Sequence, residues 1–190
     1  MKAHRQKTAS RAAPEIRAMV DEALKIACAI VHDDEWYTRP DGPPSFSDIY
    51  VWVLQQAGEV AGGVELPADR EPKESCVAVV ARVLLVAERA QRHGAEEMAD
   101  RLESAVVKSL KRYPGSRCML LALGEEVGEL GRAITGHVLR YPRGHKKHAG
   151  KREVLAECRD VAVVALRIAL LGDDDFTPAT TPPVAEQATS

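Results

Sequence analysis

The feature that most constrains the fold is the spacing of the apolar residues. They recur every three or four positions through most of the chain, between breaks rich in proline and glycine. This spacing gathers apolar side chains on one face of an α-helix, whereas a half-buried strand needs strict alternation, which no segment shows. The valine-rich stretch "SCVAVVARVLLVA" is the best candidate for a buried strand, but its length and charged flanks favour a helix. The chain is therefore predicted to be an all-α helical bundle.

The breaks divide the chain into six expected helices. Pro14 is expected to open the first, Ser47 or Asp48 to cap the second, and Gly94 and Gly172 to end the third and the sixth. The helices are predicted to span residues 15–32, 48–63, 73–93, 95–112, 117–140 and 152–171. The basic segment 1–13 and the polar, proline-rich segment 173–190 are expected to be disordered.

The length is sufficient for one domain with its own core, or for two small halves that share one. The chain has 190 residues and a net charge of −2, so its overall charge does not favour a nucleic-acid partner. No segment resembles a secretory signal or a membrane-spanning helix. The four cysteines are widely separated in apolar, helical contexts, which is typical of reduced core residues in a cytoplasmic protein.

The two halves of the chain resemble each other. Residues 51–64 align with 121–134, and residues 74–94 align with 152–172, apolar position on apolar position. Arg89 falls on Arg167 in this alignment. We therefore expect a duplication, with one helical half at 14–94 and a second at 95–172.

The second half carries two acidic pairs on apolar helices. Glu126 and Glu129 lie on one face of the fifth predicted helix because they are three residues apart, and Glu157 and Asp160 repeat this spacing on the sixth. A single acidic pair of this kind is usually a solvated face, but two pairs on adjacent helices would repel each other strongly. A hard divalent cation relieves such repulsion, and a donor set made only of oxygens suits Mg²⁺ or Mn²⁺. The first half lacks this charge, because its aligned residues are Gln55, Gln56, Val79 and Arg82.

The sequence "EEVGE" at 125–129, followed by Glu157-x-x-Asp160, resembles the EExxE…ExxD signature of the MazG-like all-α nucleoside triphosphate pyrophosphohydrolases. The resemblance covers residues 95–172. It implies that Glu126, Glu129, Glu157 and Asp160 bind Mg²⁺, and that Glu125 orients or deprotonates a water that attacks the α-phosphorus. The implied products are a nucleoside monophosphate and pyrophosphate.

The same resemblance implies a site built from a four-helix bundle, which relatives such as the dimeric dUTPases form between subunits. A degenerate first half fused to a catalytic second half would supply that bundle as a pseudo-dimer, and a homo-oligomer also stays open. One position departs from the family pattern. Val164 stands where relatives often carry a polar or aromatic residue that helps to hold the nucleoside.

Two further features are candidates for substrate binding. The basic loop after the fifth helix, with Lys146, Lys147, Lys151 and Arg152, is either a clamp for the triphosphate or a solvated loop. Trp52 either stacks on the base or belongs to the core.

The sequence raises two alternatives to hydrolysis. One is a helical interaction or regulatory module without catalysis, which the degenerate first half and Val164 favour. The other is a di-iron carboxylate protein, which would need a histidine three residues after a glutamate, and neither acidic pair is followed in that way.

Overall fold

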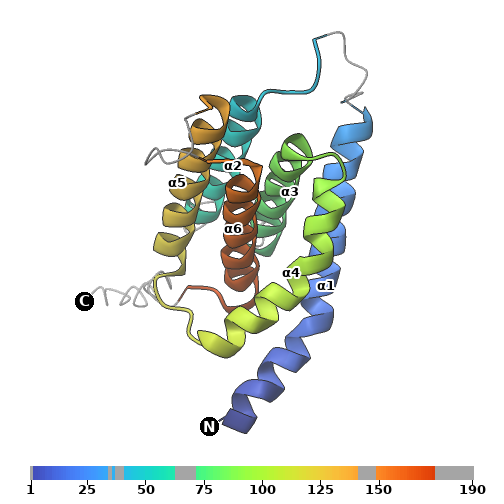
Figure 1. The fold of residues 1–190 in the computed structure, drawn as a ribbon. Helices are drawn as coiled ribbons and strands as arrows, with labels where there is room; N and C mark the ends of the chain where they lie inside the picture. Colours follow the sequence, from blue (N-terminus) through green and yellow to red (C-terminus); the bar gives the residue numbers. More distant parts are fainter. Residues whose placement is uncertain (1, 34–35, 37–40, 63–71, 141–148, 174–190) are drawn as a thin grey trace, which may run out of the picture.

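The computed structural model describes residues 2–33, 36, 41–62, 72–140 and 149–173. This part of the chain forms six α-helices and contains no strand, so the predicted all-α class is confirmed (Figure 1). The helices are α1 (Lys2–Asp33), α2 (Phe46–Gly62), α3 (Pro72–Ala90), α4 (Gly94–Arg112), α5 (Met119–Val138) and α6 (Lys151–Leu171). None of these described helices has the length and apolar character needed to cross a membrane.

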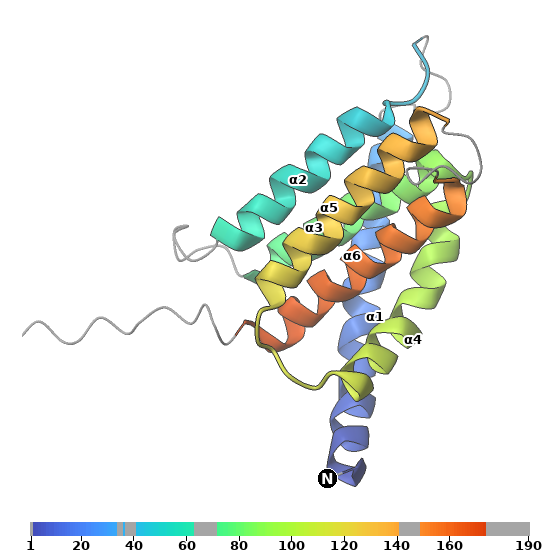
Figure 2. The same cartoon turned by 60° about the vertical axis from the view of Figure 1, so that its left-hand side comes forward.

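Helices α3 and α6 pack against each other at the centre of the bundle. Helices α2 and α5 cover them on one side, and α1 and α4 on the other (Figures 1 and 2). This position explains the valine-rich sequence of α3. From Val79 to Ala87 every residue except Arg82 is fully buried, because neighbours surround the helix on nearly all sides.

Each helix of the first half packs on its counterpart in the second half. The contacting pairs are α1 with α4, α2 with α5 and α3 with α6. This is the arrangement that two duplicated three-helix halves would adopt around a two-fold axis.

The aligned arginines of α3 and α6 make matching contacts. Arg89 donates a hydrogen bond to the Pro44 carbonyl at 3.1 Å, in the segment before α2. Arg167 donates to the Tyr113 and Gly115 carbonyls at 2.7 and 2.8 Å, in the segment before α5. Both arginines therefore tie the last helix of their half to the start of its middle helix, which supports the expected duplication.

Helix α1 begins at Lys2, well ahead of the predicted start at Pro14 and within the segment expected to be disordered. Its first turns project beyond the rest of the bundle (Figure 2). The segment contains several good helix formers. Pro14 does not end the helix, because a proline inside a helix removes one hydrogen bond and favours a kink without always causing a break.

Gly94 does not end α3 as predicted. The helix stops at Ala90, His93 takes the left-handed conformation with φ of 62°, and Gly94 is the first residue of α4. A β-carbon on Gly94 would lie 2.3 Å from the Ala87 carbonyl oxygen, so glycine is required for the close approach of the two helices. Gly172, with φ of 69°, does follow the end of α6 as predicted.

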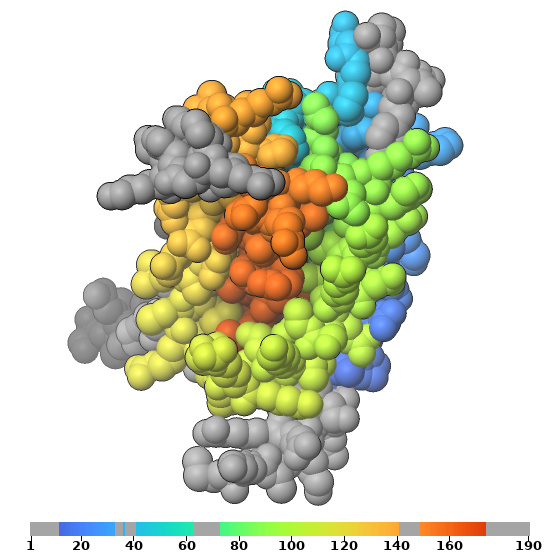
Figure 3. Space-filling model, in the orientation of Figure 1, coloured from blue at the N-terminus to red at the C-terminus, as the bar shows by residue number. Residues whose placement is uncertain are grey.

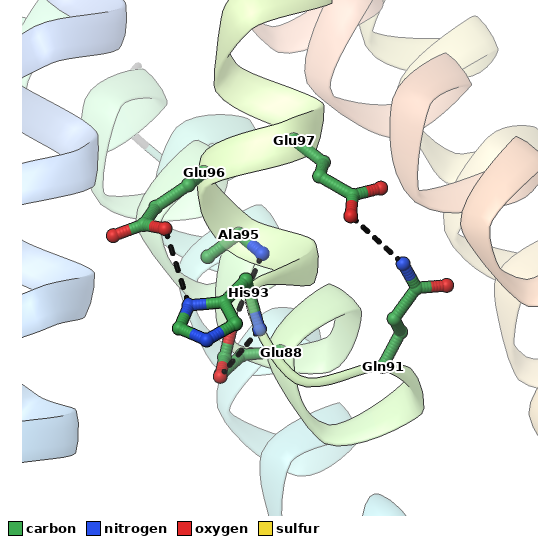
Figure 4. Close-up of polar contacts among 6 residues, drawn as sticks. All are labelled: Glu88, Gln91, His93, Ala95, Glu96 and Glu97. Atoms are coloured by element: carbon green, nitrogen blue, oxygen red, sulfur yellow. Dashed lines mark hydrogen bonds and ion pairs between the residues drawn. The ribbon is translucent and has the colours of Figure 1, made fainter.

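A buried carboxylate holds this corner together (Figure 4). Glu88 accepts hydrogen bonds from the backbone N–H groups of His93 and Ala95, at 3.1 and 3.3 Å. These groups lie at the start of α4, where they have no partner within the helix and where a negative charge is favourable. A contact of 3.3 Å between His93 Nδ1 and a Glu96 carboxylate oxygen and a hydrogen bond from Gln91 to Glu97 extend the contact at the surface.

Two of the four cysteines are not in the core. Cys76 and Cys158 are buried as expected, but Cys28 and Cys118 are exposed. Cys28 lies on the outer face of α1, and Cys118 lies in the turn before α5 with φ of 55°.

Candidate metal centre

Three glutamates of the second half converge between α5 and α6. Glu126, Glu129 and Glu157 each offer a carboxylate oxygen, and these oxygens all lie within 4.8 Å of one another. The two helices run antiparallel side by side (Figure 2), and part of α6 is open at the molecular surface between α5 and α4 (Figure 3). The structure therefore brings together three of the four residues expected to bind a metal ion.

The apolar stripes of the two helices set this orientation. On α5, Leu123, Val127 and Leu130 are buried in the core, and the glutamates next to them are held half-buried at its edge. On α6, Val154 and Cys158 are buried in the same way beside Glu157. Burial of the stripes thus directs both acidic faces into one shallow space.

The shared space disfavours ionisation of two of the glutamates. Burial and then the negative charges of Asp160, Glu129 and Glu157 raise the pKa of Glu126. Burial and the charges of Glu129 and Asp160 likewise raise the pKa of Glu157, and Arg132 and Arg159 oppose this rise. The site holds more negative charge than its protein surroundings compensate, which is the condition that a cation relieves.

Asp160 lies beside the three glutamates but bonds elsewhere. Its carboxylate accepts two hydrogen bonds from Arg159, at 2.9 and 3.1 Å. On the facing helix Arg132 donates to Glu129 at 2.7 Å. Neither arginine was predicted to lie at the site, although the i,i+3 spacing of Glu129 and Arg132 is a recognisable signal.

The other predicted residues fall at different places. Glu125 is exposed next to the cluster, and Lys151 and Arg152 are exposed in the first turn of α6. Lys146 and Lys147 lie outside the described residues. Glu153 accepts a hydrogen bond from the Gly150 N–H at 2.8 Å and so caps α6.

Trp52 and Val164 bear on how a base would be held. Trp52 is half-buried in a separate cleft of the first half, where the Arg82 guanidinium lies 5.8 Å from its ring centroid. The structure therefore does not group Trp52 with the carboxylates. Val164 is buried against the core and offers no polar contact.

The first half holds α5 in place through Tyr50. Its hydroxyl donates to the Val127 carbonyl at 2.9 Å, between Glu126 and Glu129 along α5. A β-carbon on Gly131 would lie 2.3 Å from that hydroxyl, so any larger residue at this position would displace the Tyr50 ring. Local sequence patterns do not predict this contact, because its partners are far apart in the chain.

The donor set fits a hard cation. Carboxylate oxygens bound to one Mg²⁺ lie roughly 3–4 Å apart, since each is about 2.1 Å from the ion. Small side-chain rotations would bring the three glutamate oxygens into that range from their present spacing of up to 4.8 Å. The fold and the site thus define an all-α bundle with a half-buried carboxylate cluster on neighbouring helices.

Searches of protein-family models, of curated proteins and of solved structures returned no match to this chain.

Proposed function

We propose that the protein hydrolyses a nucleoside triphosphate at the α-phosphorus, giving a nucleoside monophosphate and pyrophosphate. The observation that carries this proposal is the convergence of Glu126, Glu129 and Glu157 within 4.8 Å. The EExxE…ExxD pattern of these helices and their all-α setting also support it.

The proposed cofactor is Mg²⁺, with Mn²⁺ as a substitute, held by Glu126, Glu129 and Glu157. Asp160 is the fourth proposed ligand, since its charge already acts on Glu126 and Glu157. A bound divalent cation would neutralise phosphate charge and lower the pKa of a coordinated water.

The protein residues around the cluster have distinct proposed roles. Glu125 accepts a proton as the water oxygen bonds to the α-phosphorus, and the bond from that phosphorus to the bridging oxygen of pyrophosphate breaks. Arg132 and Arg159 lie at the rim, paired with Glu129 and Asp160. Once a cation binds Glu129 or Asp160, the arginine paired with that carboxylate can bind a phosphate instead. Guanidinium groups suit this role because two of their N–H groups can donate to two phosphate oxygens at once.

The test is a substrate panel. Purified protein is incubated with ribo- and deoxyribonucleoside triphosphates and Mg²⁺, and pyrophosphate is assayed. We expect release from at least one substrate, inhibition by EDTA, and a loss of at least about 100-fold in kcat for Glu126→Gln. Asp100→Asn, at an exposed acid on α4, is the matched control and should keep full activity. Pyrophosphate release by none of the triphosphates would refute the proposal.

A helical module without catalysis is the alternative. The pairing of Glu129 with Arg132 and of Asp160 with Arg159 favours it, because these contacts compensate part of the charge without a metal. It predicts that Mg²⁺ leaves the melting temperature unchanged, whereas a cation that binds only the native state would raise it.

A further inference from the structure

The first half contains a cleft at the place that corresponds to the carboxylate cluster. It lies among α1, α2 and α3 and has a volume of about 380 Å³. Its described lining residues are Ile30, Trp52, Gln55, Gln56 and Arg82. Small-molecule sites generally measure about 300–1,000 Å³ and combine an apolar wall with a few polar groups, and this cleft does both.

The residues that line this cleft include a cation and two amides where the second half has carboxylates. Gln55 and Gln56 align with Glu125 and Glu126, and Arg82 aligns with Asp160. None of the described residues that line the cleft is acidic. The cleft therefore suits an anion, whereas the cluster on α5 and α6 suits a cation.

Arg82 is the group on which the recognition depends. It is half-buried in α3 among fully buried neighbours, and its guanidinium lies 5.8 Å from the Trp52 ring centroid. Burial lowers its pKa, while the charge of Glu59 opposes that effect. Glu59 does not line the cleft, and a guanidinium with five N–H groups can keep an acidic neighbour and still bind a phosphate.

We propose that this cleft binds a nucleoside monophosphate without a metal ion. The phosphate pairs with Arg82, the planar base stacks on Trp52, and the amides of Gln55 and Gln56 supply donors and acceptors for the edge of the base. A single phosphate fits best, because Arg82 is the one cation among the described lining residues. The inference does not depend on the proposed hydrolysis, since it uses none of the carboxylates.

The experiment is calorimetric titration of the full chain with AMP, GMP, CMP and UMP in excess EDTA. Without a metal, the carboxylate cluster repels a phosphate, so binding reports on the cleft of the first half. We expect one site per chain for at least one nucleotide. The parent nucleoside and inorganic phosphate, titrated alone, should each bind at least about tenfold more weakly, because each makes only part of the contacts.

Substitutions locate the site. Arg82→Gln and Gln56→Glu should each weaken binding by about tenfold or more, the first by removing the cation and the second by adding a repelling charge. Gln56→Glu keeps the test decisive if Arg82→Gln unfolds, because Gln56 is only half-buried on α2 and the substitution changes its size little. Arg101→Gln, at an exposed arginine of α4, is the matched control, and Glu126→Gln should also leave binding unchanged.

Three results would overturn the proposal. They are no binding of any nucleotide, equal binding of nucleoside and nucleotide, and loss of binding in Glu126→Gln with retention in Gln56→Glu.

Discussion

Selection for stability alone would not favour a glutamate at position 126. Burial and four neighbouring carboxylates raise its pKa, so its ionised form is disfavoured in the metal-free protein. Groups that bind ligands often cost stability in this way, because the same repulsion makes a bound cation favourable.

A glutamine at this position should therefore stabilise the metal-free protein. We expect Glu126→Gln to raise the melting temperature in EDTA by about 2 °C and to abolish the rise that Mg²⁺ causes in the wild type. Differential scanning fluorimetry with and without Mg²⁺ measures both effects. Glu125→Gln, at the exposed neighbour, is the control and should change the value in EDTA by less than about 1 °C. A lower melting temperature for Glu126→Gln in EDTA would contradict the charge argument.

A second prediction concerns the cap of α2, which is Ser45 and not Ser47. Asp48 accepts hydrogen bonds from the Ser45 hydroxyl and backbone N–H, at 2.7 and 3.0 Å, and its own N–H donates to the Ser45 hydroxyl at 3.2 Å. The bonds from the hydroxyl and then from the backbone lower the pKa of Asp48. The folded pKa is below the unfolded one, so the stabilisation is present above pH of about 4 and is lost as pH falls through the folded pKa.

Asp48→Asn should accordingly lower the melting temperature at neutral pH, with a difference from the wild type that shrinks as pH falls towards 3. Thermal unfolding measured between pH 3 and 7 tests this, with Asp41→Asn as a nearby exposed control. A difference that stays constant over this range would exclude the charged cap as its cause.

At the scale of the elements, the contact between α2 and α5 sets the position of two of the carboxylates. Tyr50 reaches the Val127 carbonyl only because Gly131 leaves room for its ring. Phe46 packs edge-on against His137 further along the same pair of helices, with ring centroids 5.4 Å apart. The half without the carboxylate cluster therefore has a structural role, since it holds the acidic half in register.

We expect Gly131→Ala to destabilise the protein by about 1–3 kcal/mol, because the new methyl group displaces the Tyr50 ring. Gly124→Ala, on the same helix with open space around it, should stabilise by up to about 1 kcal/mol through helix propensity. Tyr50→Phe should cost about 0.5–1.5 kcal/mol, and the double variant Tyr50→Phe/Gly131→Ala less than the sum, because both changes break one contact. Urea unfolding measures all four, and strict additivity would show that the two residues act separately.

At the scale of the whole molecule, the bundle has the form of two three-helix halves packed helix on counterpart helix. Arg89 and Arg167 tie corresponding segments in the two halves, but Arg167 reaches two carbonyls with one nitrogen and Arg89 reaches one. The two halves therefore share a framework, while their clefts differ in charge.

Arg167→Gln should lower the free energy of unfolding by about 1.5–3 kcal/mol, because it removes the buried charged donor that binds the carbonyls of Tyr113 and Gly115. Arg89→Gln should cost less, since one bond to Pro44 is lost. Chemical denaturation of the two variants makes the comparison. An equal or larger loss of stability in Arg89→Gln would show that the number of hydrogen bonds does not determine the contribution of each arginine.

The helical class, the extents of the middle and last helices and the acidic faces of α5 and α6 could be predicted because they depend on local spacing. An apolar residue every three or four positions defines a buried stripe, and two glutamates three residues apart share a face whatever surrounds them. The alignment of the two halves could also be made from the sequence, because it only compares residue types along the chain.

Only the tertiary structure decided which groups meet. That Tyr50 reaches Val127 and that Trp52 lies beside Arg82 in a separate cleft both depend on how helices distant in sequence are packed. The role of Gly94 also depended on packing. The sequence predicts that a glycine is conformationally free, but not which carbonyl would clash with a side chain at that position. Local periodicity determines what each helix exposes, whereas close packing between helices determines what those exposed groups touch.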